Sequence, residues 1–296
     1  MIEKTGVFSV VGRPNAGKST LTNTLCGAKV AIVSNKPQTT RNRITGVLTK
    51  GTVQMVFLDT PGLHKPQNSL GDYMVKIVNK TVTDVDAAIL IVEPVARVGI
   101  PEQMLIDRIR QDHIPAILVI NKIDTIPNEK LLEIMDVYGK AHEFLAIVPV
   151  CARTGKGVSV LLEELDKLCI ESPALFPEDM ISDQPERQLI AEIIREKILQ
   201  KLDKEIPHGV AVEIEKMEER ETGTVAVYAA IYCEKKSHKG ILIGKGGEML
   251  KKIGATARYE IEKLLDTKVY LELWVRVKED WRNNPNQIRN FGYEEE

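Results

Sequence analysis

Hydrophobic and polar positions alternate with two different periods along the first 170 residues. Short β-branched runs occupy residues 7–11, 53–58, 87–92, 116–120 and 146–150. Longer stretches with helical spacing lie between them, at residues 18–26, 70–82, 101–111, 129–144 and 159–170. This alternation predicts an α/β fold in which helices cover both faces of a mostly parallel sheet. Residues 43–49 are also β-rich, and we expect them to form a hairpin with residues 53–58.

The pattern changes after a proline-containing stretch. Pro173, Pro177 and Pro185 interrupt both periods, so we interpret residues 173–186 as a linker between domains at residues 1–172 and 187–296. Beyond it, helical spacing at residues 186–205 precedes strand-like runs at 210–214 and 225–232. A strand-like run at 241–243, a helix at about 248–265 and a strand at 269–277 follow. The order α-β-β-α-β predicts a small α+β domain. Trp274 and Trp281 are expected in its core or at its rim, with base stacking as the alternative.

A glycine-rich motif follows the first apolar run. Residues 12–19 fit G-x-x-x-x-G-K-[ST] and precede a predicted helix. In such a loop, backbone N–H groups surround phosphates and the helix N-terminus adds positive potential. We expect Lys18 to contact the β- and γ-phosphates and Ser19 to ligate Mg²⁺. The residues expected to bind the nucleotide here are Gly12, Arg13, Pro14, Asn15, Ala16, Gly17, Lys18, Ser19 and Thr20.

Three more short motifs each follow an apolar run. In the first (Asp59, Thr60, Pro61, Gly62, Leu63), Asp59 is expected in the Mg²⁺ shell and the Gly62 N–H at a γ-phosphate. In the second (Asn121, Lys122, Asp124), a carboxylate can accept two hydrogen bonds that guanine offers and adenine does not, which predicts GTP over ATP. Lys122 is expected along the base and Asn121 between neighbouring loops. In the third (Cys151, Ala152, Arg153), a backbone N–H is expected at guanine O6.

Four motifs in this order resemble the GTPase superfamily over residues 5–170. The resemblance implies a P-loop GTPase domain with a mixed, mostly parallel sheet, GTP and GDP as ligands, and Mg²⁺. Cys151 stands where Ser is usual. We expect this difference to weaken guanine binding little, because the expected contact with the base there is made by the backbone.

Residues 27–43 are expected to carry the first switch segment. One of the adjacent threonines Thr39 and Thr40 should complete the Mg²⁺ shell in the GTP state, and Thr40 is favoured. A simple turn or strand role is the alternative for either threonine. The metal ligands expected are therefore Ser19, Thr40 and Asp59.

Leu63 occupies the position where many regulatory GTPases have a Gln that orients water. Because leucine cannot hydrogen-bond water, we expect slow intrinsic turnover. In related GTPases an Asn at the position of Asn15 binds K⁺, which replaces an arginine finger; shaping the loop is the alternative role, and a partner's charge is the rival source of stabilisation. The predicted catalytic set is Lys18, Asn15, Thr40 and Gly62.

A second loop motif, Gly244-Lys-Gly-Gly247, precedes a predicted helix in the second domain. Glycines let a loop approach a sugar–phosphate backbone, and a helix N-terminus attracts phosphate. Residues 234–258 contain seven Lys or Arg against two Glu. A solvated charged face is the alternative to RNA contact. The expected RNA-binding residues are Lys239, Ile243, Gly244, Lys245, Gly246, Gly247, Lys251 and Lys252.

The whole chain has 296 residues, with 40 Lys and Arg against 42 Asp and Glu. This balance excludes a protein that binds nucleic acid non-specifically through an overall positive charge, but it does not exclude a local basic site. The four cysteines are far apart in sequence and indicate neither a zinc site nor a disulfide framework. The start of the chain lacks a signal-peptide pattern, and no apolar run approaches the ~20 residues of a spanning helix. We therefore expect a cytoplasmic protein.

A GTPase domain followed by a KH domain of the bacterial arrangement (type II) resembles the Era family of bacterial ribosome-assembly GTPases along nearly the whole chain. The resemblance implies binding to small-subunit ribosomal RNA near its 3′ end and a role in rRNA processing and small-subunit biogenesis. It also implies a monomer and peripheral contact with the inner face of the cell membrane. The alternative is a membrane-associated cell-cycle or signalling GTPase with secondary RNA binding, which would predict a basic amphipathic lipid-binding helix; we see none clearly in the sequence.

Overall fold

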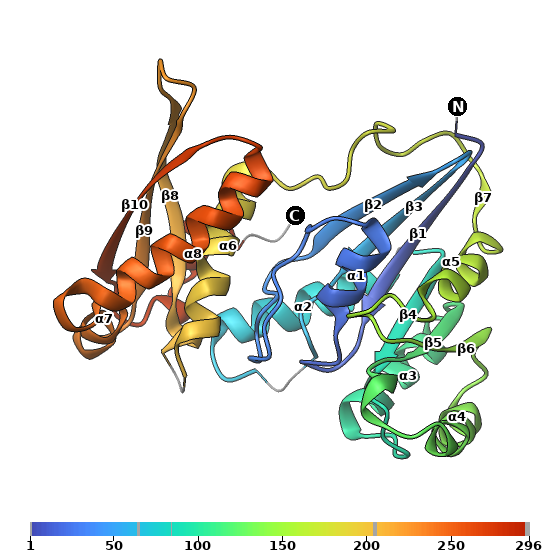
Figure 1. Ribbon diagram of the computed structural model, residues 1–296. Coiled ribbons are helices and arrows are strands. Elements are labelled where there is room, and N and C mark those ends of the chain that lie inside the picture. Colours follow the sequence, from blue (N-terminus) through green and yellow to red (C-terminus); the bar gives the residue numbers. More distant parts are fainter. Residues whose placement is uncertain (1, 64–65, 84, 204–205, 294–296) are drawn as a thin grey trace. The chain divides into compact units, whose positions relative to one another are not determined.

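The computed structural model describes residues 2–63, 66–83, 85–203 and 206–293 and divides the chain into two compact units (Figure 1). The N-terminal unit comprises Met1–Val33, Thr40–Pro66 and Gly71–Asp183. The C-terminal unit comprises Ser34–Thr39, Gln67–Leu70 and Gln184–Glu296. Each unit is described by itself. Among the described residues, no helix combines the length and the apolar character needed to traverse a bilayer.

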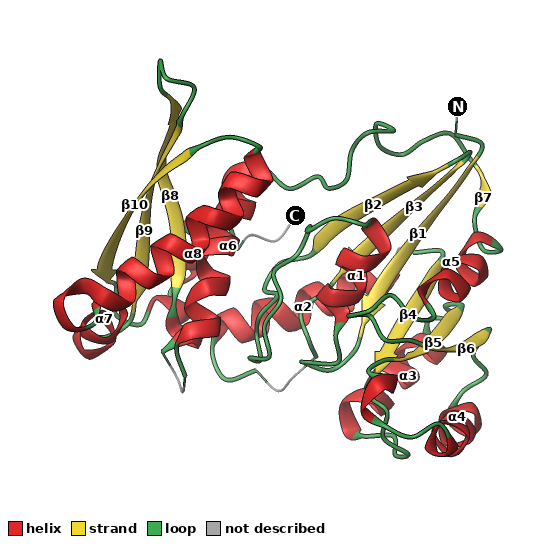
Figure 2. Ribbon diagram, in the orientation of Figure 1, coloured by secondary structure: helices red, strands yellow, loops and turns green. Residues whose placement is uncertain are grey.

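The N-terminal unit is built on a sheet with the strand order β2-β3-β1-β4-β5-β6 (Figure 2). The strands are β1 (Lys4–Val11), β2 (Ile44–Lys50), β3 (Val53–Asp59), β4 (Ala87–Val92), β5 (Ala116–Ile120) and β6 (Ala146–Pro149). β2 pairs antiparallel with β3, as the predicted hairpin requires, and the other pairs in this order are parallel. A short strand, β7 (Ile170–Glu171), pairs antiparallel with β1, where the sequence predicted the end of a helix.

Helices cover both faces of this sheet. The apolar sides of α1 (Lys18–Cys26) and α5 (Val158–Asp166) pack in one core cluster with the β1 residue Phe8. The apolar sides of α3 (Ile100–Gln111) and α4 (Glu129–Ala141) pack in the other, together with Val78 of α2 (Ser69–Thr83). This is the two-sided covering that the alternating pattern predicted.

The parallel arrangement determines where functional loops lie. Strands β1, β3, β4, β5 and β6 run in the same direction, so their carboxyl ends meet at one edge of the sheet. Ligands of open α/β sheets bind at this edge. The segments that begin there start at or just after Gly12, Asp59, Glu93, Asn121 and Val150.

The C-terminal unit has a three-stranded sheet in the order β10-β9-β8. Its elements in chain order are α6 (Glu186–Lys201), β8 (Ala211–Glu219), β9 (Val225–Cys233), α7 (Lys236–Ile243), α8 (Glu248–Leu265), β10 (Val269–Val277) and α9 (Pro285–Asn290). β10 pairs parallel with β9, and β8 pairs antiparallel with it. α6 and α8 pack on one face of the sheet, with Ile194 and Ile261 in the shared core (Figure 1).

One prediction for this unit is wrong. Residues 241–243 end helix α7 instead of forming a strand, so the order is α-β-β-α-α-β. Leu242 is buried while Ile241 is 47% exposed, and a run of three apolar residues is too short to distinguish the two periods. Trp281 is fully buried and donates from Nε1 to the Gly209 carbonyl at 2.9 Å, as expected. Trp274 on β10 is 55% exposed, so of the two expected positions the core is excluded for it.

Candidate functional site

The glycine-rich loop connects β1 to α1 and holds a buried lysine. Lys18 Nζ donates to the carbonyl oxygens of Gly12 at 3.2 Å and Arg13 at 3.1 Å. Burial lowers the pKa of Lys18 to about 8, and the negative charge of Asp59 opposes this shift. Gly17 has φ of +103°, and a Cβ there would lie 2.1 Å from Asn121 Nδ2. Glycine at position 17 therefore lets the loop pack against the Asn121 side chain, and with a pKa of about 8 the Lys18 ammonium is mostly protonated at neutral pH.

A hydroxyl pair and a buried carboxylate without a hydrogen-bond partner could hold a cation here. Ser19 Oγ and Thr40 Oγ1 lie 2.7 Å apart. Asp59 is fully buried, and neither of its carboxylate oxygens has a hydrogen-bond partner of good geometry. Burial raises the pKa of Asp59 to about 6, against the lowering effect of the Lys18 charge. Mg²⁺ prefers oxygen ligands, so two hydroxyl oxygens beside a buried carboxylate that lacks hydrogen-bond partners fit this ion.

The choice between the two threonines follows from these contacts. Thr40 is buried and meets Ser19, whereas the Thr39 hydroxyl donates to the Lys36 carbonyl in a local turn at 2.6 Å. The described residues contain no group of three His, Cys, Asp or Glu side chains that could hold a metal alone. A Mg²⁺ ion here would therefore take further ligands from water and from nucleotide phosphates.

The two base-recognition loops are tied together through Asn121. Its Nδ2 donates to the Ala16 carbonyl at 2.8 Å, and its Oδ1 accepts from the Ala152 N–H at 3.0 Å. The prediction that Asn121 connects neighbouring loops is confirmed. Lys122 Nζ donates to the Asn15 carbonyl at 2.7 Å, so the base loop also contacts the phosphate loop.

Asp124 lies beside groups that favour its charged form. The Cys151 thiol lowers the pKa of Asp124, and the Arg153 guanidinium, at 2.8 Å from Oδ2, adds to this effect. The sequence predicted only a backbone role for this segment, and in the structure the Cys151 N–H donates to the Lys156 carbonyl at 2.9 Å. An ionised carboxylate is the acceptor that guanine recognition needs.

The segment after Asp59 returns to the phosphate loop. The Leu63 N–H donates to the Gly12 carbonyl at 3.4 Å, which places the adjoining Gly62 beside that loop. The Leu63 side chain is buried in an apolar cluster with Val11 and Val78. It cannot orient a water molecule, in agreement with the sequence prediction. His64 and Lys65 lie outside the described residues.

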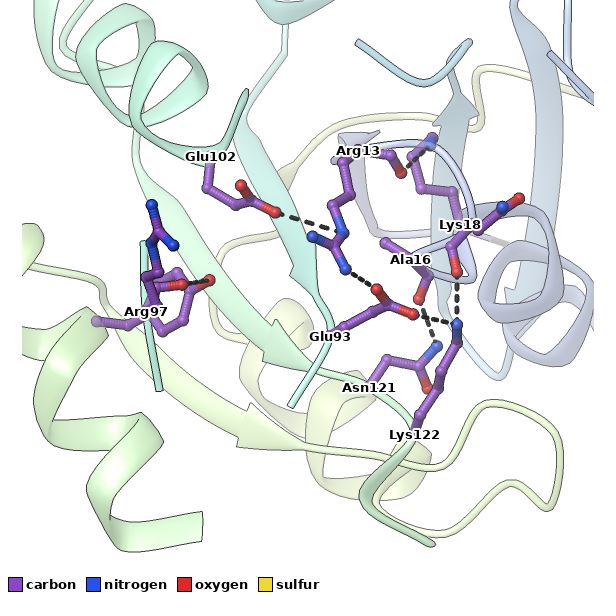
Figure 3. A network of polar contacts seen from close by, with 10 residues as sticks. Arg13, Ala16, Lys18, Glu93, Arg97, Glu102, Asn121 and Lys122 are labelled. Atoms are coloured by element: carbon purple, nitrogen blue, oxygen red, sulfur yellow. Dashed lines mark hydrogen bonds and ion pairs between the residues drawn. The ribbon is translucent and has the colours of Figure 1, made fainter. Parts of the chain in front are cut away.

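Sequence reasoning missed two carboxylates at this site, Glu93 and Glu102 (Figure 3). The Arg13 guanidinium pairs with Glu93 and approaches Glu102, with 3.6 Å between Arg13 Nε and Glu102 Oε1. Glu93 also pairs with Lys122, with Oε1 and Nζ 2.5 Å apart. The available signal was positional, because Glu93 directly follows the apolar run of β4 at the ligand-binding edge of the sheet.

The basic loop of the C-terminal unit lies between α7 and α8. Gly244 has φ of +74°, and a Cβ there would lie 2.8 Å from that of Met249. Lys245 and Gly246 are exposed just before the N-terminus of α8. Lys239, Lys251 and Lys252 are also exposed, and within the described parts of the chain none of these four lysines forms an ion pair. Such a surface can accept phosphates without first breaking ion pairs.

The apolar residues around this loop divide between the core and its margin. Ile253 is fully buried. Ile243, Met249 and Leu250 are half-buried and pack against the core cluster from outside. These three residues leave apolar surface beside the loop. RNA-binding modules use such surface to contact bases while the loop contacts the sugar–phosphate backbone.

Comparisons with known proteins agree with both units. A family model described as "50S ribosome-binding GTPase" matches residues 7–122, and one described as "KH domain" matches residues 205–282. GTPase Era of Ruminiclostridium cellulolyticum is 52% identical over 99% of this chain and 98% of its own length. GTPase Era of Clostridioides difficile is 51% identical over 98% of each.

Two solved structures are similar over nearly the whole chain, each at 39% identity and covering 98% of this chain and 99% of the other. One is an Aquifex aeolicus Era variant bound to GDP·AlF₄⁻, with a TM-score of 0.94. The other is Era in complex with MgGDPNP and nucleotides 1506–1542 of 16S ribosomal RNA, with a TM-score of 0.95. A P-loop GTPase unit followed by a KH domain, with relatives of this identity and coverage, shows that the chain belongs to the GTPase Era family.

Proposed function

We propose that this GTPase is a GTP-gated RNA-binding factor of the cytoplasm, which binds small-subunit ribosomal RNA near its 3′ end and acts in rRNA processing and small-subunit biogenesis. The observation that carries the proposal is the 244–247 loop with its exposed Lys245, beside the exposed Lys251 and Lys252 of α8, in a chain that has an ordered guanine-nucleotide site. The solved Era complex with 16S rRNA nucleotides supports the choice of RNA.

The contacts at the sheet edge support a role for each nucleotide-site residue. Lys18, already protonated and directed along the loop carbonyls, stabilises negative charge on the transferred phosphoryl group. Ser19, Thr40 and Asp59 hold Mg²⁺, which supplies charge neutralisation on the phosphate oxygens. Asp124 accepts from guanine, and Asn121 keeps its loop in register with the phosphate loop. The buried Leu63 leaves water positioning to other groups, so intrinsic hydrolysis is slow.

The nucleotide gates RNA binding through the first switch segment in this proposal. Thr40 joins Ser19 by a single hydroxyl contact, and a γ-phosphate with Mg²⁺ adds ligands that hold Thr40 in place. Hydrolysis removes those ligands and releases the segment. The solved Era structure that holds MgGDPNP and 16S ribosomal RNA nucleotides together supports a link between nucleotide state and RNA binding.

Crosslinking in cells tests the proposal. The chain is crosslinked to RNA, recovered in buffers containing either GTP or GDP, and the bound RNA is sequenced. We expect reads concentrated at the 3′ end of small-subunit rRNA and more abundant with GTP. A Lys245→Glu, Lys251→Glu variant should lose these reads, and Lys263→Glu, Lys268→Glu, at exposed positions near the far end of α8, should keep them.

Two results would contradict the proposal. Reads spread evenly over cellular RNA would remove the assignment to ribosomal RNA. Recovery of the chain with anionic vesicles but not with RNA would favour the membrane-associated signalling alternative.

A further inference from the structure

Glu93 occupies a central position among the loops of the nucleotide site. One carboxylate oxygen, Oε1, lies 2.5 Å from Lys122 Nζ, and the other, Oε2, pairs with the Arg13 guanidinium. Arg13 belongs to the phosphate loop and Lys122 to the base loop, so a single carboxylate joins two loops from different strands (Figure 3). The Glu93 side chain is 22% exposed, whereas those of Arg13 and Lys122 are 38% and 37% exposed, so water screens both pairs in part.

A second carboxylate anchors Arg13 from a helix. Glu102, in the first turn of α3, is 3% exposed and lies 3.6 Å from Arg13 Nε. Its other oxygen, Oε2, lies over Gly99, where an added Cβ would come within 2.5 Å of it. Glu102 therefore has little room to move, and it keeps Arg13 directed towards Glu93.

The network balances two cations with two anions. Burial and then the positive charge of Arg13 lower the pKa of Lys122, so the two cations lie close enough to repel each other. The Glu93 carboxylate pairs with both cations and offsets their mutual repulsion. Removing its charge would leave Lys122 repelled by Arg13 and attached to the phosphate loop only through the Asn15 carbonyl, at 2.7 Å.

We propose that Glu93 is a positioning residue for guanine-nucleotide retention: it braces the base loop against the phosphate loop through Lys122 and Arg13. The brace lies apart from Ser19, Thr40 and Asp59, with which Glu93 makes no contact in the described chain. It therefore acts on the binding of GDP and GTP alike and not on hydrolysis. The proposal rests on the assignment of the nucleotide to this site.

The decisive measurement is the dissociation rate of fluorescent GDP and of a fluorescent non-hydrolysable GTP analogue from the full chain. Glu93→Gln keeps the size of the side chain and removes the charge, and we expect both nucleotides to leave about tenfold faster. Single-turnover hydrolysis of pre-bound GTP, measured beside release, separates retention from chemistry: a hydrolysis rate that falls as far as retention does would contradict a role in binding alone. Glu93→Asp should recover part of the retention. Glu133→Gln removes one exposed negative charge from α4 and serves as the matched control.

A double-mutant cycle separates positioning from a general structural role. If Glu93 acts through Lys122, Glu93→Gln should accelerate release much less in a Lys122→Gln background than in the parent. Release rates unchanged by Glu93→Gln would overturn the proposal. So would an acceleration equally large in both backgrounds, or one confined to the GTP analogue. Failure of the parent and of Glu133→Gln to bind GDP would instead overturn the assignment of the nucleotide site.

Discussion

The nucleotide site and the basic 244–247 loop both face phosphates in our assignment, yet they are built in opposite ways. In the nucleotide site, key polar groups are buried and held by neighbours: the Lys18 ammonium by loop carbonyls, and the Asn121 amide by two loops at once. In the basic loop, Lys245, Lys251 and Lys252 are exposed and make no ion pair within the described chain. One site is organised before its ligand arrives, and the other is left accessible.

The difference follows from what each site must distinguish. A small ligand is selected by buried groups that remain unpaired when the wrong ligand binds, so the geometry must be fixed in advance. A sugar–phosphate backbone is attracted by accessible cations through release of counterions, and glycines allow close approach. The buried ammonium of Lys18, held by two loop carbonyls, and the exposed ammonium of Lys245 are the two extremes of this contrast.

The largest effect is expected at the base-recognition carboxylate. Asp124→Asn replaces a charged double acceptor with a neutral amide that faces the guanine donors with one oxygen only. We expect GTP affinity to fall roughly 100- to 1,000-fold, the loss of a charge-assisted hydrogen-bond pair. Competition between GTP and ATP, measured by equilibrium binding, should show that the preference for GTP has collapsed. An unchanged preference would contradict the base assignment and the idea of a pre-organised site.

A smaller effect, with a different signature, is expected at the exposed loop. Lys245→Glu with Lys251→Glu removes two phosphate contacts, which should reduce the salt slope of single-stranded RNA binding by about 1.4 and affinity about 25-fold at 0.1 M salt. Titrations at several salt concentrations measure both quantities. Lys263→Glu with Lys268→Glu makes the same change in net charge elsewhere on the unit and should alter neither. Equal slopes for parent and loop variant would remove the loop from the binding face.

The sequence predicted most of the nucleotide site because its parts are local. Each motif directly follows an apolar strand, and parallel strands bring their carboxyl ends together, so Lys18, Asp59, Asn121 and Asp124 could be placed at one edge from spacing alone. Helices α1 and α8 and strand β10 also agree with their predicted ranges, because long amphipathic stretches and regular alternation carry strong periodic signals.

What the sequence did not predict depends on tertiary contacts. Glu93 and Glu102 belong to no motif, and their pairing with Arg13 appears only when β4, α3 and the phosphate loop are in place. Residues 241–243 read as a strand because three apolar residues fit either period, and Gly240 obscured the helix. The exposure of Trp274 depends on which face of the sheet α6 and α8 cover, a choice that alternation along one strand cannot make.

The adjacent threonines allow a sharper test of pre-organisation. Thr40→Ala removes the hydroxyl that meets Ser19 and should slow Mg²⁺-dependent GTP hydrolysis about tenfold, the scale of one lost polar interaction. Thr39→Ala removes only the turn hydrogen bond to Lys36 and should leave the rate within about twofold. Single-turnover hydrolysis at several Mg²⁺ concentrations compares the two. If the Thr39 variant is the slower one, the metal ligand has been assigned to the wrong threonine.

The smallest effect concerns Asn15, which has two candidate roles. It either shapes the phosphate loop in advance or offers an accessible side chain to a K⁺ ion. Its φ of +65° is a left-handed conformation, so the residue could serve only to shape the loop. If its exposed side chain instead holds K⁺, hydrolysis should be about threefold faster in K⁺ than in Na⁺ at equal ionic strength. Asn15→Gly keeps the left-handed backbone accessible and removes the side chain. The K⁺ preference should then disappear while GTP binding persists. A preference that survives in the glycine variant, or equal rates in both salts for the parent, would leave Asn15 with the shaping role.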